Sequence, residues 1–100
     1  MRYKVVFTPE AQRDLFEVFD YIAGRDGETR ALKYIARIEK ACQSLRTLPA
    51  RGTLRKDLRP GLRVIGLERS GVIAFTVSSS SVAILRILYG GRSLEHAFRP

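Results

Sequence analysis

The stretch VAILRILYGGR, residues 82–92, decides how this chain folds. Seven of its first eight residues are apolar and Tyr-Gly-Gly closes the run, which predicts a buried strand that ends in a turn. Strict alternation along a strand would place Arg86 on one face with Val82, Ile84 and Leu88. A guanidinium buried there without a partner would cost several kcal/mol. Either a carboxylate meets Arg86, or its face of the sheet is open to bind something.

The first half of the chain predicts one strand followed by two helices. A β-branched and aromatic run at residues 3–7 is typical of a strand. Thr8 and Pro9 then suit the N-cap and the first position of a helix, and apolar residues at spacings of three and four continue it to about Gly24. A second apolar stripe predicts a helix over residues 28–48. The short link between the two helices predicts an antiparallel hairpin.

The second half predicts three strands, at residues 62–68, 71–77 and 82–88, after a loop at residues 49–61 that is rich in Pro, Gly and Arg. The order β-α-α-β-β-β predicts an α+β fold over residues 1–100, a single domain. A helical hairpin would pack on one face of a small antiparallel sheet. Because two helices can cover only one face, we expect the other face to be open or covered by a partner.

Charge is distributed unevenly along the chain, which carries a net +8. Residues 1–45 hold eight basic and seven acidic residues, a net of +1, whereas residues 46–100 hold ten and three, a net of +7. The second half therefore favours a polyanionic partner, such as nucleic acid or an acidic protein segment. No signal-peptide pattern opens the sequence and no apolar run is long enough for a membrane span, so we expect a cytoplasmic protein with no membrane contact.

The residue inventory excludes chemistry that needs several His or Cys side chains. The chain holds one His, His96, and one Cys, Cys42, too few for an ordinary zinc site, a Cys-His pair or an internal disulfide. Phosphate-binding and dinucleotide motifs are absent, because the Tyr-Gly-Gly turn follows a strand but begins no helix. We therefore expect neither a metal nor a cofactor.

Basic residues populate the loop, the strands and the terminal turn of the second half. Arginine forks bind phosphate or carboxylate in a bidentate manner, so these side chains could bind a polyanion if they converge on the open sheet face. A solvated basic surface is an equal alternative for residues 51–59. The set consists of Arg51, Arg55, Lys56, Arg59, Arg63, Arg69, Arg86 and Arg92.

A metal-independent ribonuclease is the enzyme alternative. Cleaving RNA through its own 2′-hydroxyl needs a base, an acid and cations around the phosphate. The cations are present, but Tyr89 and Lys56 have ordinary pKa values of about 10 and would need large shifts to act as base or acid. Asp57 and Glu68 could act as a base, yet no motif places either carboxylate at a phosphate. The residues permit this chemistry without indicating it.

Four segments together resemble the RelE/ParE superfamily of bacterial toxins from type II toxin–antitoxin pairs. They are YKVVFTPEAQRDLFEVFDYIA at residues 3–23, YIARIEKACQSLRTLPARG at 34–52, DLRPGLRVI at 57–65 and VAILRILYGGRSLE at 82–95. Their order and spacing extend over essentially the whole chain. The resemblance implies a RelE/ParE-like fold in a bacterial, cytoplasmic protein.

The resemblance divides between two activities. RelE-like members cleave messenger RNA in the ribosomal A site, whereas ParE-like members inhibit DNA gyrase. LRPGLR and LYGGR are closer to the ParE branch, although the usual His of its last strand is Tyr89 here. The resemblance therefore implies a gyrase-inhibiting binding protein, with target or antitoxin contacts at Arg59, Arg63, Arg86, Tyr89 and Arg92. The RelE-like alternative is a ribosome-dependent endoribonuclease with candidate catalytic residues Arg55, Lys56, Arg63, Arg86 and Tyr89.

The resemblance also implies a cognate antitoxin whose C-terminal segment, often acidic and amphipathic, wraps around the toxin in a hetero-oligomer. Such a segment would complement the basic second half and cover the open sheet face. We therefore expect Arg86 to face a groove and to be satisfied by a partner's carboxylate or by a phosphate. An internal pair with Asp57 or Glu68 is the structural alternative. An inactive or purely regulatory relative is the third possibility for the chain as a whole.

Overall fold

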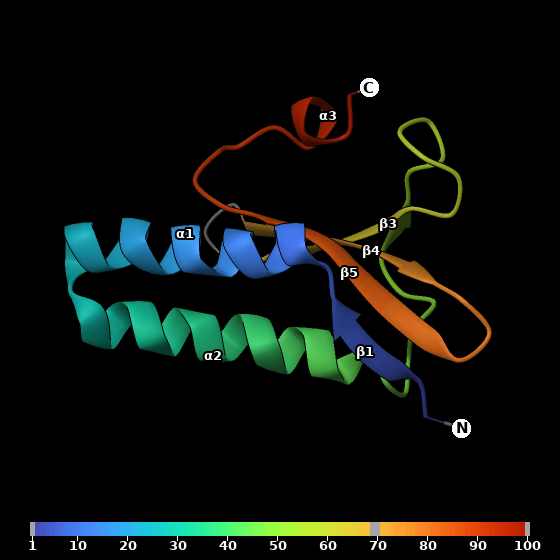
Figure 1. The fold of residues 1–100 in the computed structure, drawn as a ribbon, viewed down its shortest axis with the longest axis horizontal. Helices are drawn as coiled ribbons and strands as arrows, with labels where there is room; N and C mark the ends of the chain where they lie inside the picture. Colours follow the sequence, from blue (N-terminus) through green and yellow to red (C-terminus); the bar gives the residue numbers. More distant parts are fainter. Residues whose placement is uncertain (1, 69–70, 100) are drawn as a thin grey trace.

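The computed structural model describes residues 2–68 and 71–99, whose elements form two layers (Figure 1). Along the chain they are β1 (Lys4–Phe7), α1 (Pro9–Asp26), α2 (Glu28–Ser44), β2 (Thr53–Leu54), β3 (Arg63–Leu67), β4 (Gly71–Val77), β5 (Ser81–Leu88) and α3 (Leu94–Ala97). One layer is the hairpin of α1 and α2, and the other is a five-stranded sheet in the order β1-β5-β4-β3-β2. No helix in this described part of the chain is long and apolar enough to span a bilayer.

The hairpin forms from the signals that the sequence carries, with shifted ends. The Thr8 hydroxyl oxygen accepts a hydrogen bond from the Ala11 N–H at 3.1 Å, and Pro9 takes the first helical position, where it loses no helix bond. The helix continues past its expected end at Gly24. Gly27 alone then turns the chain into α2, with a φ of 94° that favours glycine. The two helices are therefore joined directly.

α2 is shorter than predicted, because it ends at Ser44. The next residue, Leu45, is fully buried, so the chain turns inward there instead of continuing the helix. The Tyr3 N–H donates to the Arg46 carbonyl at 2.8 Å. This bond ties the end of the hairpin to the start of β1.

The sheet is mixed rather than purely antiparallel. β1 pairs in parallel with β5, with Lys4 opposite Ser81 and Phe7 opposite Ile84, while the other three pairs are antiparallel. A parallel pair needs a long connection, and here the hairpin and two further strand pairs provide it. The α+β fold with a helical hairpin on one face is present as predicted. β2 and α3 are additional, in segments that were expected to be a loop and a tail.

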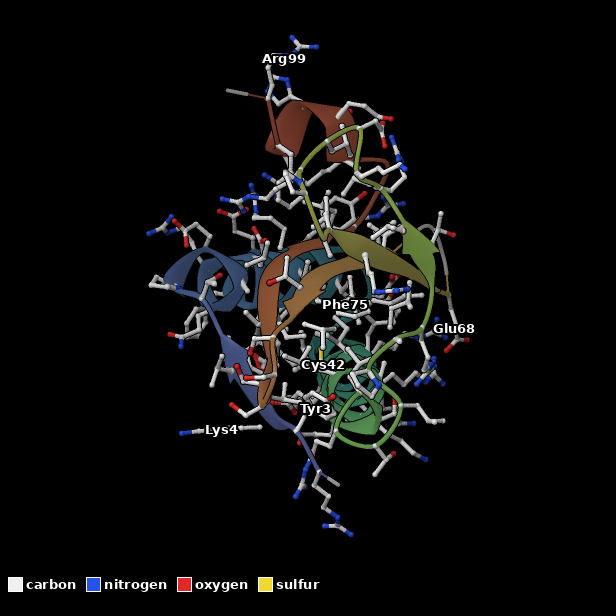
Figure 2. The ribbon with its side chains drawn as sticks, turned by 90° about the vertical axis from the view of Figure 1, so that its right-hand side faces the viewer. Tyr3, Lys4, Cys42, Glu68, Phe75 and Arg99 are labelled. Atoms are coloured by element: carbon white, nitrogen blue, oxygen red, sulfur yellow. The ribbon has the colours of Figure 1, made fainter. Side chains whose placement is uncertain are left out.

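The main core lies between the hairpin and the sheet. Its fully buried side chains include Ile38 and Cys42 of α2, Ile73 and Phe75 of β4, and Ile84 of β5. Figure 2 shows Phe75 and Cys42 in the interior between the sheet and the helices. This layer buries the apolar stripes that the spacing of the sequence predicts.

A β-bulge in β5 breaks the alternation on which the prediction for Arg86 rested. Ile84 lies opposite Phe75 and Arg86 lies opposite Ala74, so Leu85 is an extra residue without a partner in β4. The predicted placement of Arg86 and Ile84 on one face is therefore wrong. Ile84 packs into the main core, whereas Arg86 lines a groove beside Leu85.

The sheet face opposite the hairpin has a smaller core of its own. Leu62, Ala74, Leu88 and Leu94 are buried there, and Phe98 packs against them. The chain after β5 loops back, so that α3 lies beside the loop between β2 and β3 (Figures 1 and 2). The expectation that no element remains to cover this face is therefore wrong, because the C-terminal segment covers part of it.

Asp14 connects α1 to β5. Its carboxylate accepts two hydrogen bonds from the Arg86 guanidinium, at 2.8 and 3.0 Å, and a third from the Ile87 N–H at 2.8 Å. β1 ends at Phe7, which lies opposite Ile84, so the edge of β5 has no neighbouring strand beyond that point. Asp14 therefore satisfies a backbone N–H that the sheet leaves unpaired. The side chain of Asp14 is only 4% exposed, so this cluster is shielded from water.

Replacing Asp14 with Ala is expected to lower the free energy of unfolding by about 3 kcal/mol, because a mostly buried guanidinium and a backbone N–H then lose their acceptor. Arg86→Ala should also destabilise the protein, and the double variant should lose at least about 1 kcal/mol less than the sum of the two. Urea titrations of the three variants measure these differences. Asp20→Ala, an exposed acid on the same helix, is the control and should change stability by less than about 0.5 kcal/mol. Additive losses would contradict the coupling.

Candidate functional site

A groove of about 530 Å³ opens where α1, the loop between β2 and β3, and the C-terminal segment meet. We call it the basic groove. The first turn of α1 forms one side, the bulged part of β5 forms the floor, and the loop and the chain after α3 form the remaining walls. Its lining residues are Thr8, Glu10, Leu58, Arg59, Leu85, Arg86, Ala97, Phe98 and Arg99.

The cations of the basic groove differ in how they are balanced. Asp14 holds Arg86 from behind, and the hydrogen bonds that it accepts raise the pKa of the guanidinium above its ordinary value. Arg59 and Arg99 are exposed, and neither has an ion-pair partner among residues 2–68 and 71–99. Glu10 is the one acid of the lining. The groove can therefore accept carboxylate or phosphate through two unneutralised guanidinium groups.

The floor and walls of the basic groove are partly apolar. Leu58, Leu85 and Phe98 are half-buried and belong to or border the smaller core. Figure 2 shows Arg99 at the outer end of the C-terminal segment. An extended or helical peptide with alternating acidic and apolar side chains would meet matching chemistry along this groove.

Arg55 fastens the C-terminal wall of the basic groove. Its guanidinium donates to both oxygens of Asp57 at 3.0 Å and to Glu95 of α3 at 3.1 Å. These bonds from Arg55 lower the pKa of the Asp57 carboxyl and contribute to lowering the pKa of Glu95, after the backbone N–H of Glu95 itself. Arg55 thus holds the loop and α3 together beside the apolar contacts that they share.

The predicted binding residues do not converge on one surface. Arg59 and Arg86 line the basic groove. Arg63 lies on the β3 face whose other residues pack toward the hairpin, so it lies on the opposite side of the sheet. Arg92 forms an ion pair with Glu17 at 2.7 Å. The predicted convergence of the whole basic set is therefore wrong, and Arg69 lies outside the described residues.

Tyr89 lies on the hairpin side of the sheet, because the bulge reverses the alternation of β5 before it. Its ring contacts the rings of Tyr21 and Tyr34 edge-on, with centroids 5.7 and 4.9 Å away. Tyr34 in turn donates its hydroxyl to the Glu68 carbonyl at 2.6 Å. Tyr89 is therefore part of an aromatic cluster that joins the hairpin to the end of β5.

The candidate ribonuclease residues are separated by the same geometry. Arg55 is held by two carboxylates, Arg86 is held by a third, and Tyr89 lies in the other layer. Lys56 is exposed beside Arg55 and Arg63 lies across the sheet. No base and acid are brought to a common phosphate position by these side chains as they stand.

The pairing of Arg86 corrects the prediction for this residue. It does line a groove as expected, but its partner is internal, and that partner is Asp14 rather than Asp57 or Glu68. The sequence carried a signal for this pair. Asp14 falls on the apolar stripe of α1 between Ala11 and Val18, where a carboxylate needs a buried cation. Glu95 and Arg99 were also missed, because the segment after β5 was expected to be a polar tail.

Nucleophilic and metal chemistry find no support in the described residues. No three His, Cys, Asp or Glu side chains of residues 2–68 and 71–99 gather closely enough to hold a metal ion. Burial raises the pKa of the Cys42 thiol to about 12. Cys42 therefore stays protonated in the core at neutral pH and packs as a small apolar side chain.

Comparisons with known proteins agree with this geometry. A family model described as the ParE toxin of the type II toxin–antitoxin system parDE matches residues 5–94. Toxin ParE3 of Caulobacter vibrioides is 34% identical over 91 residues, which cover 91% of this chain and 90% of that protein. A solved structure described as the chromosomal ParDE system of P. aeruginosa is 29% identical, has a TM-score of 0.75, and matches 86% of this chain and 94% of its own. The predicted RelE/ParE-like fold and the closeness to the ParE branch are confirmed.

Replacing Arg55 with Gln is expected to loosen α3 from the loop, because both of its carboxylate partners lose their donor. Amide hydrogen exchange should become several-fold faster at α3 and at the loop, while α1 and α2 keep their protection. Acid should have the same effect on the wild type. The bonds depress the pKa values of Asp57 and Glu95 below 3.8 and 4.5, so their contribution is complete above these values and is lost as the pH falls through the depressed pKa values.

Lys56→Gln is the matched control for this experiment, because Lys56 is exposed next to Arg55 and has no ion-pair partner in the part of the chain that the structure describes. Unchanged exchange at α3 in Arg55→Gln would contradict the fastening role. Equal acceleration in Lys56→Gln would assign the effect to net charge instead.

Proposed function

Because this chain belongs to the ParE toxin family of type II toxin–antitoxin systems, we propose that it inhibits DNA gyrase and that a cognate antitoxin holds it inactive. The solved relative is described as a ParDE system, which supports a partner of this kind for the present chain. We further propose that the toxin acts in the bacterial cytoplasm, where gyrase acts on the chromosome. The protein would act by binding and not as an enzyme.

The basic groove is the observation that carries this proposal to particular residues. It offers two exposed guanidinium groups, Arg59 and Arg99, above an apolar floor that includes Leu85. Such a surface suits a protein segment that presents carboxylates beside apolar side chains. We assign to the groove the contact with gyrase, and we propose that an acidic, amphipathic C-terminal segment of the antitoxin neutralises the toxin by occupying the same groove.

The ribonuclease alternative receives less support from the geometry. Its residues would have to move out of ion pairs and across the sheet to meet at one phosphate. The basic groove by itself has cations but no paired acid and base. The test below nevertheless separates the two activities directly.

The double variant Arg59→Gln, Arg99→Gln should inhibit gyrase about tenfold less well than wild type, since it loses two charge-assisted contacts to the target. The toxin is purified and refolded without antitoxin, and the concentration that halves DNA supercoiling is read from gels. The double variant Arg30→Gln, Lys40→Gln removes the same charge from α2 and should inhibit like the wild type.

The same samples are tested for cleavage of messenger RNA on programmed ribosomes. Cut RNA with unaffected gyrase would replace the proposed function by the ribonuclease alternative. Equal inhibition by both double variants would leave gyrase as the target but remove the basic groove as its contact surface.

A further inference from the structure

A second groove, of about 670 Å³, runs between α1 and α2 on the solvent side of the hairpin. We call it the hairpin groove. It lies in the opposite layer from the basic groove and shares no lining residue with it. Its lining residues are Gln12, Leu15, Phe16, Phe19, Asp20, Leu32, Ile35 and Glu39.

The hairpin groove exposes large apolar side chains to water. Phe16 is 73% exposed and Leu32 is 61% exposed, one on each helix. Between them Leu15, Phe19 and Ile35 are half-buried, with their inner sides against the main core. The core is therefore complete without Phe16 and Leu32. A continuous apolar surface of this kind on a small domain is typical of a binding site.

The groove has the dimensions of a helix-binding surface. Gly27 alone joins the antiparallel helices, so Leu15 and Glu39, each twelve residues from it, lie at about the same level. Asp20 lies five residues from that level, which is about 7 Å along α1 at 1.5 Å per residue. The apolar floor between these levels matches one to two turns of an amphipathic helix laid along the hairpin.

The rim of the hairpin groove is acidic on both walls. Asp20 belongs to α1 and Glu39 belongs to α2, and the only other polar lining residue is Gln12. Neither carboxylate forms an ion pair with any residue that the structure describes. This is an acidic site on a chain of net charge +8. A helix with Lys or Arg on both flanks of its apolar stripe would complement it.

A second copy of this chain fits the groove poorly. In a two-fold contact each groove would meet itself, so Asp20 and Glu39 would face the same carboxylates or Gln12 across the interface. Two chains of net charge +8 would also repel one another. The rim therefore favours a different protein that brings cations.

We propose that the hairpin groove binds a basic amphipathic helix of the antitoxin, separate from the acidic segment assigned to the basic groove. The inference rests on the proposed function only for the identity of the partner. The two grooves carry opposite charge, so each accepts one segment of the partner and rejects the other. The order of the two segments along the partner would then fix the direction in which it wraps around the toxin.

The charge preference is tested with two synthetic helical peptides that share one Leu/Phe stripe and differ only in flanking Lys or Glu. Fluorescence anisotropy should give a Kd for the Lys peptide at least tenfold below that for the Glu peptide. Asp20→Asn with Glu39→Gln should abolish this preference. Equal binding of both peptides to the wild type, or binding of neither, would overturn the assignment.

The place of the contact is tested with the double variant Phe16→Gln, Leu32→Gln. Both side chains are exposed, so the fold should be retained, and circular dichroism checks this. Binding of the Lys peptide and of the full-length protein encoded beside this gene should weaken at least tenfold. Leu54→Gln, an exposed apolar residue on β2, is the control and should bind like the wild type.

The outcomes separate this inference from the proposed function. If the neighbouring protein binds the wild type and the Phe16/Leu32 variant equally well, the hairpin groove is not its site, while the antitoxin partnership stands. If that protein does not bind at all and gyrase is unaffected, the proposed function fails. A dimer of the free toxin in analytical ultracentrifugation that the Phe16/Leu32 variant dissolves would replace the antitoxin helix by a second copy.

Discussion

The carboxylate of Asp14 is the point at which the two layers and the basic groove depend on each other. β1 covers only part of the edge of β5, and α1 begins immediately after β1. Asp14 extends that cover by accepting the Ile87 N–H and at the same time receives both arms of Arg86. Without this acceptor a backbone donor and a guanidinium would compete for water at the edge of the core. With it, β5 is fixed against α1 and Arg86 has a defined place in the lining of the groove.

The bulge at Leu85 gives this contact its direction. It lets Ile84 and Ile87 both pack into the main core, with Leu85 and Arg86 between them turned to the other side. The same reversal carries Tyr89 into the aromatic cluster under the hairpin. One inserted residue therefore decides which side chains of β5 reach the groove, and it divides a basic sequence into two separate surfaces.

Local patterns predicted the elements, and distant contacts explain what was missed. β4 occupies the predicted residues 71–77, because its strand pattern is written in adjacent residues. The end of α2 was misplaced because Leu45 turns into a core built by the rest of the chain. The parallel pairing of β1 with β5 depends on residues more than 70 positions apart, as does the pair of Asp14 with Arg86. Within the site, Arg59 and Arg86 were predicted, whereas strand alternation without the bulge misplaced Tyr89.

Opposite charge on the two grooves follows from how the sequence is divided between the layers. The hairpin is built almost entirely from the first 45 residues, which are nearly neutral, so two acids suffice to make its apolar groove negative. The second half is strongly basic, and its excess cations collect where the loop and the C-terminal segment meet. A partner that contacts both layers must then carry segments of both signs, and a uniformly acidic or basic chain would be repelled at one of the two grooves. Specificity for one partner can thus arise from the placement of charge even where the apolar contacts are generic.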